Sequence, residues 1–132
     1  MKTLENKINK MSLAIKAMED ARYAADEASR NISRDTESFT IDGKTIEMLT
    51  NEARASIEHY LQANKEARLA EKAAIKEVAK VAKAFGFRLK KKPCWHEDVL
   101  RLAYRLKARY EDMLAAMHKL SQFDEYLEPA ID

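Results

Sequence analysis

Cys94 and His96 lie two residues apart in this chain and carry the groups that bind zinc or form an activated thiol. A zinc site needs about four such ligands, but Cys94 is the single cysteine of the sequence. We therefore interpret Cys94 as a partly buried thiol and His96 as an imidazole that caps a helix, beside the packing ring of Trp95. The sequence predicts no metal site.

The histidines and glycines match no catalytic or cofactor-binding motif. A helical di-iron site needs Glu-x-x-His pairs, and none of the three histidines, His59, His96 and His118, follows a glutamate at that spacing. A phosphate-binding loop needs several neighbouring glycines, whereas Gly43 and Gly86 each stand alone. We expect a protein that is not an enzyme and that uses no cofactor.

Positive charge is concentrated in one part of the chain. Residues 65–109 contain fourteen Lys and Arg against five Asp and Glu, whereas residues 1–64 carry a net charge of −2 and residues 110–132 carry −5. Such a cluster favours binding to phosphates or to an acidic protein surface. The alternative is a solvated helix face, because the outer positions of coiled coils are normally charged.

The basic residues form two helical stripes joined by a loop. Spacings of three and four residues place side chains on one face of a helix, and the loop adds a tryptophan that can stack on a nucleic-acid base. The candidate residues for an anionic partner are Arg68, Lys72, Lys76, Lys80 and Lys83, then Arg88, Lys90, Lys91, Lys92 and Trp95, then Arg101, Arg105 and Arg109. The acidic tail, residues 124–132, either folds back on this band or repels nucleic acid.

Apolar residues recur every three or four positions along three long stretches, the first from Leu4 to Ile32, the second from Ala53 to Phe85 and the third from Val99 to Leu127. On a helix, each stretch places its apolar residues on one side, as an apolar stripe. This repeat is typical of helices wound round each other. It predicts an all-α fold, an elongated antiparallel three-helix bundle like a coiled coil, as a single domain over residues 1–132. The predicted helices cover about residues 3–34, 47–85 and 96–127, with a basic loop at 86–95.

A small β-hairpin is predicted at about residues 38–46, between the first two helices. Asp42 and Gly43 separate two stretches rich in β-branched residues, and Asp-Gly supplies the two positive φ angles of a type I′ turn. An isolated hairpin is marginally stable in water. We therefore expect its apolar side to lean on the helix ends or on a partner.

A second candidate surface is apolar. Leu13, Leu69 and Leu102 lie off the apolar stripes among mostly charged neighbours. We expect them to be exposed as anchors for a partner helix.

Every long apolar run is broken by charge within a few residues, so the sequence predicts no transmembrane span. Charged residues make up 35% of the chain, which is typical of long solvated helices. Together with the single cysteine, this favours a cytoplasmic protein without membrane contact.

Three functions fit these patterns. The first is a non-enzymatic helical interaction protein, an adaptor or an inhibitor of the phage or mobile-element type, that binds a protein or nucleoprotein through its basic band and exposed helix faces. The alternative is direct binding of DNA or RNA by the same band. The third is a structural scaffold that assembles as a homo-oligomer.

Overall fold

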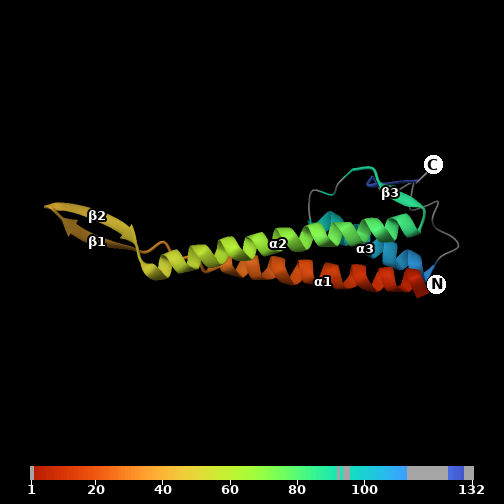
Figure 1. Ribbon diagram of the computed structural model, residues 1–132, viewed down its shortest axis with the longest axis horizontal. Coiled ribbons are helices and arrows are strands. Elements are labelled where there is room, and N and C mark those ends of the chain that lie inside the picture. The colour runs from red at the N-terminus through yellow and green to blue at the C-terminus, as the bar shows by residue number, and fades with distance from the viewer. Residues whose placement is uncertain (1, 92, 94–95, 113–124, 130–132) are drawn as a thin grey trace. The chain divides into compact units, whose positions relative to one another are not determined.

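The computed structural model describes residues 2–91, 93, 96–112 and 125–129. These residues are mostly helical, in α1 (Lys2–Arg30), α2 (Asn51–Ala84) and α3 (His96–Glu111). They also form the short strands β1 (Thr36–Ile41), β2 (Lys44–Leu49), β3 (Phe87–Leu89) and β4 (Leu127–Pro129) (Figure 1). The prediction of a largely helical chain with a small antiparallel hairpin is confirmed. No helix among the described residues is both long enough and apolar enough to cross a membrane.

The chain divides into two compact units, unit 1 with Met1–Met18 and Ala70–Asp132, and unit 2 with Glu19–Leu69. All three helices contribute to the core of unit 1, through residues of the predicted apolar stripes such as Met11, Val78 and Leu106. The stripe positions Met113, Met117 and Leu120 lie outside the described residues. The buried members of this core are Ile8, Met11, Met18, Ala74, Val78, Val81, Ala82, Phe85, Phe87, Val99, Leu102, Ala103, Leu106, Tyr126 and Leu127.

Unit 2 has a core of small side chains, drawn from the second half of α1 and the first half of α2. The buried members are Ala25, Ala28, Ala63 and Ala67, with Ala21 and Tyr60 packed against them. A cluster made of alanines requires the two backbones to approach closely, near the short end of the ~8–10 Å range of interaxial distances.

The hairpin of unit 2 has the predicted turn. β1 and β2 pair antiparallel with Ile41 opposite Lys44, and Asp42 and Gly43 between them have φ angles of 52° and 79°. These are the two positive angles of a type I′ turn. A Cβ atom on Gly43 would meet no atom within 4 Å, so there is room for a side chain. Glycine is favoured here because of the positive φ angle.

The helix ends next to the hairpin are set by side-chain hydrogen bonds. α2 begins after Thr50, whose Oγ1 accepts a hydrogen bond from the N–H of Ala53 at 3.0 Å and so caps the helix. α1 ends at Arg30, about four residues before the predicted end. The N–H of Ser33 donates to Oγ of Ser56 at 2.9 Å, so this backbone donor is satisfied by α2 and not by a further turn of α1.

The chain after α3 differs from the prediction of one helix to about residue 127. The described part of α3 ends at Glu111, residues 113–124 lie outside the described residues, and Leu127 begins β4. β4 pairs antiparallel with β3, which falls within the predicted basic loop. The N–H of Lys90 extends this pairing by donating to the carbonyl oxygen of Tyr126 at 2.9 Å. Leu127 keeps its place in the core, but on a strand.

Two of the three leucines predicted to be exposed are exposed, namely Leu13 and Leu69, whereas Leu102 is buried in the core of unit 1. The prediction for Leu102 is wrong because the buried face of α3 is wider than one stripe. Leu102 lies three residues after Val99 and four before Leu106, which is the spacing of a broad apolar helix face.

Replacing Leu102 with alanine should lower the free energy of unfolding by about 2–5 kcal/mol, because it removes a buried side chain and leaves a cavity. The same truncation at exposed Leu13 should change it by less than about 0.5 kcal/mol. Urea denaturation followed by far-UV circular dichroism measures both variants. Equal losses at the two positions would contradict the burial of Leu102.

Candidate anion-binding surface

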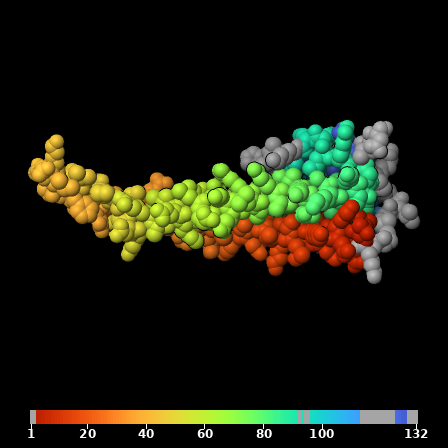
Figure 2. All heavy atoms as spheres, in the orientation of Figure 1, coloured from red at the N-terminus to blue at the C-terminus, as the bar shows by residue number. Residues whose placement is uncertain are grey.

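A row of lysines occupies the outward side of α2 in unit 1. Lys72, Lys76, Lys80 and Lys83 follow one another at three or four residues, and all are exposed. Figure 2 shows this half of α2 in green. The buried residues of the same helix segment, such as Val78, lie on the opposite side. We call these four lysines the lysine face. Arg68, one turn earlier on α2, is also exposed but belongs to unit 2.

Most of the lysine face has no neutralising partner among the residues that the structure describes. Lys80 Nζ lies 3.2 Å from Glu77 Oε1 in an i,i+3 ion pair. Within the part of the chain that the structure describes, Lys72, Lys76 and Lys83 make no hydrogen bond or ion pair. Like charges one helical turn apart repel each other by a few tenths of a kcal/mol, so an anion placed along this side relieves repulsion as well as forming new contacts.

The basic loop differs from the lysine face, because residues 125–129 of the acidic tail fold back on it. Arg88 Nε lies 2.6 Å from Glu128 Oε1, and Lys91 Nζ lies 3.1 Å from Glu125 Oε2. Lys91 also lies over the ring of Tyr126, 4.9 Å from its centroid. Two loop cations of the predicted band therefore already hold carboxylates of the same chain. Lys90 is exposed, and Lys92 and Trp95 lie outside the described residues.

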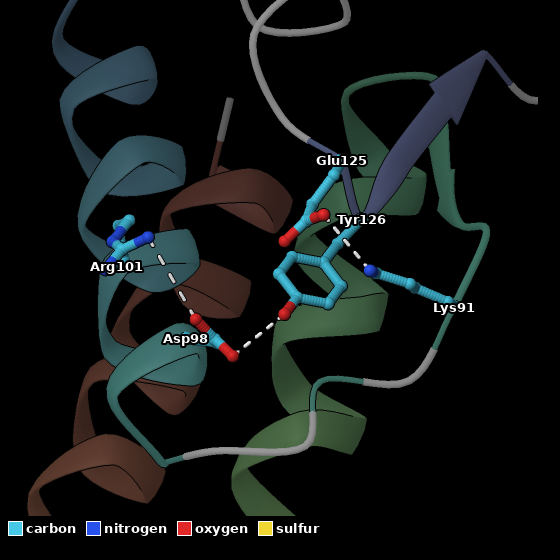
Figure 3. A network of polar contacts seen from close by, with 5 residues as sticks. All are labelled: Lys91, Asp98, Arg101, Glu125 and Tyr126. Carbon is cyan, nitrogen blue, oxygen red and sulfur yellow. Dashed lines mark hydrogen bonds and ion pairs between the residues drawn. The ribbon is translucent and has the colours of Figure 1, made fainter.

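Apolar burial holds the tail in place more strongly than its ion pairs do. Leu127 is 1% exposed and Tyr126 is 9% exposed, both within the core of unit 1. Figure 3 shows Tyr126 donating a hydrogen bond from its hydroxyl to Asp98 of α3, at 2.8 Å. Burying a leucine contributes about 1.5–3 kcal/mol, whereas an exposed ion pair contributes about 0–1 kcal/mol. The tail is thus a core element that carries two carboxylates to the loop.

The three arginines predicted on α3 do not form one outward stripe. Arg101 is exposed and lies 4.0 Å from Asp98, and Arg105 is half-buried. Arg109 is only 6% exposed, and its guanidinium donates to the carbonyl oxygen of Asp112 at 3.2 and 3.4 Å. The sequence places Arg109 in the basic band, whereas the structure buries its side chain. It lies three residues after Leu106 on the buried side and satisfies a carbonyl beyond the helix end.

An aromatic side chain that the sequence reasoning missed lies on the outward side of α3. Tyr104 is 75% exposed, and exposed Arg101 and Lys107 lie three residues before and after it. Residues three apart are neighbours on a helix surface. The signal was present in the sequence, since Tyr104 lies off the apolar stripe that contains Ala103 and Leu106.

Among the described residues, no group of three or more His, Cys, Asp and Glu side chains could hold a metal ion. Cys94 and His118 lie outside those residues, and His59 is exposed on α2. Comparison of the chain with protein-family models, with curated proteins and with solved structures finds no match.

Replacing Leu127 with alanine should destabilise unit 1 by about 2–5 kcal/mol, because the side chain is fully buried in the core. Replacing Glu128 with glutamine, which removes only the exposed pair with Arg88, should cost less than about 1 kcal/mol. Differential scanning calorimetry compares the two variants. A loss for Glu128→Gln as large as for Leu127→Ala would show that charge, and not apolar burial, holds the tail.

Proposed function

We propose that this chain is a non-enzymatic interaction protein, an adaptor or an inhibitor, that binds an acidic surface of a partner protein or nucleoprotein through the lysine face of α2. One observation carries this proposal. Four exposed lysines lie on the side of α2 opposite its buried residues, and three of them have no partner among the described residues.

The spacing of the lysine face fits an extended acidic surface. From Lys72 to Lys83 the helix rises about 16 Å, at 1.5 Å per residue. One cation per turn over that length matches carboxylates presented at i,i+4 on a partner helix. Complementary charge of this kind raises the association rate and selects among partners.

The proposed architecture behind this surface is an antiparallel three-helix bundle like a coiled coil. It is supported by the shared core of unit 1, which joins Met11 of α1, Val78 of α2 and Leu106 of α3 in one buried cluster. In such a bundle the buried sides of the helices face each other and the charged sides face outward. The lysine face is then part of a rigid element, which suits a docking surface.

Reversing two charges of the lysine face, in the variant K76E/K83E, should weaken binding to a dye-labelled poly-glutamate peptide by roughly tenfold or more. The control K10E/K16E makes the same change in net charge at two exposed lysines of α1. It should weaken binding by less than about threefold if position matters more than net charge. Fluorescence anisotropy at low salt measures both, and equal weakening would refute a localised site.

A second function, binding of single-stranded nucleic acid, is favoured by the side of α3 that presents Tyr104. An exposed aromatic ring flanked by Arg101 and Lys107 offers a stacking surface for a base and cations for the adjoining phosphates. The lysine face would add phosphate contacts, whereas the paired loop residues Arg88 and Lys91 are less available than the sequence predicted.

If this second function holds, Tyr104→Ala should weaken binding of a labelled single-stranded oligonucleotide by roughly 5- to 100-fold, because one stacked base is worth about 1–3 kcal/mol. Tyr104→Phe should bind nearly normally. Tyr23 of α1, also well exposed, provides the matched control in Tyr23→Ala. Anisotropy titrations at about 50 and 200 mM salt should also show a steep salt dependence. Absence of binding at the lower salt would exclude this function.

A further inference from the structure

One face of the hairpin in unit 2 is apolar and uncovered. Residues opposite each other in the register share a face, so Phe39 and Ile46 lie together, beside Ile41 and Met48. These four side chains are between 43% and 56% exposed. The other face carries Thr36, Ser38, Thr40, Thr45 and Glu47, together with Leu49. We call the first group, Phe39, Ile41, Ile46 and Met48, the apolar face.

The hairpin is incomplete as a folded element. Every residue of β1 and β2 is exposed, so the helix ends do not cover the apolar face within the described residues. A two-stranded hairpin is marginal in water unless its apolar face is packed. Contiguous exposed apolar side chains mark an interaction surface. The sequence predicts that this face packs either on the helix ends or on a partner. Since the helix ends do not cover it, we infer a partner.

We propose that the apolar face packs against the same face of a second copy of this chain. A twofold axis perpendicular to the strands relates the two hairpins, so that their turns lie at opposite ends; we call this the end-over-end arrangement. The charges at the corners of the face favour a second copy of the chain as the partner. Glu37 lies at the base of β1 and Lys44 lies at the tip of β2, on the same face as the apolar residues and at diagonally opposite corners. One anion and one cation in this arrangement make the face complementary to itself.

In the end-over-end arrangement each β1 lies over the β1 of the other copy, running in the opposite direction. Glu37 then lies across from Ile41 of the second copy, whose cross-strand neighbour is Lys44. Packed sheets are about 10 Å apart and paired residues about 5 Å apart, so the two long side chains meet. Twofold symmetry repeats the contact, giving two Glu37–Lys44 pairs around one shared apolar layer.

The other twofold arrangement, with both turns at the same end, is disfavoured. It brings Glu37 near Glu37 and Lys44 near Lys44 of the two copies, so the corners repel. It also brings the helices of both copies to the same end, because α1 and α2 join the hairpin opposite its turn. The end-over-end arrangement sends them away in opposite directions.

The size of the face indicates a weak dimer. Six residues per strand span about 20 Å and two strands about 10 Å, so the two faces together bury roughly 400 Å². This lies well below the ~1,200 Å² of stable interfaces. Association should therefore depend on concentration in the range from about 10 µM to 1 mM.

Sedimentation equilibrium over that range tests the proposal. The single reversals E37K and K44E should each raise the dimer dissociation constant by roughly tenfold, because both symmetric corner pairs become repulsive. The double variant E37K/K44E should restore it to within about threefold. An equimolar mixture of the two single variants should associate as well as the wild type. Rescue by mixing also shows that the single variants still fold.

The control E47K makes the same charge change on the opposite face of β2 and should leave association unchanged. Ile46→Asp should abolish association. A wild type that stays monomeric at about 1 mM would overturn the proposal. So would single reversals that behave like E47K, or an Ile46→Asp variant that associates normally.

Discussion

The burial of Tyr126 and Leu127 in the core of unit 1 is the contact on which the arrangement of charge depends. It brings residues 125–129, with Glu125 and Glu128, back to the basic loop, where β4 pairs with β3. Apolar burial supplies most of the free energy, and the ion pairs of Arg88 and Lys91 follow from the position that burial imposes. A charge cluster in the sequence is thus partly neutralised in the fold.

The same constraint separates three surfaces that the sequence treated as one. Among the described residues, Arg88 and Lys91 of the loop pair with carboxylates of the tail, three lysines of the lysine face are unpaired, and α3 presents Tyr104 between two cations. The hairpin differs from all of them, because its exposed residues are apolar. We propose protein docking for the lysine face, nucleic-acid binding for the side of α3 with Tyr104, and self-assembly for the apolar face of the hairpin. Each can be removed by substitutions that leave the buried cores intact.

Much of the fold follows from the sequence because one periodic pattern extends over many residues. The apolar stripes predict most core side chains of α1, α2 and the start of α3, although Leu102 lies off the stripe and is buried. Asp42-Gly43 predicts the turn, because these two residues readily adopt its positive φ angles. Leu127 shows the limit, since one apolar residue fits the end of a helical stripe as well as a short strand. Arg109 shows a second limit. Its spacing fits the basic stripe, but burial and the carbonyl of Asp112 decide its position.

Amide hydrogen exchange at Lys90, followed by NMR, tests the central claim most directly, because this N–H donates to Tyr126 in the folded-back tail. If the tail is a core element, Lys90 should exchange roughly two or more orders of magnitude more slowly than in an unstructured peptide. Its protection should approach that of amides within α3. Exchange at the rate of an unstructured peptide would show that the tail is not held in the core. Arg88 and Lys91 would then lack their carboxylate partners in the tail and would be available to bind an anion.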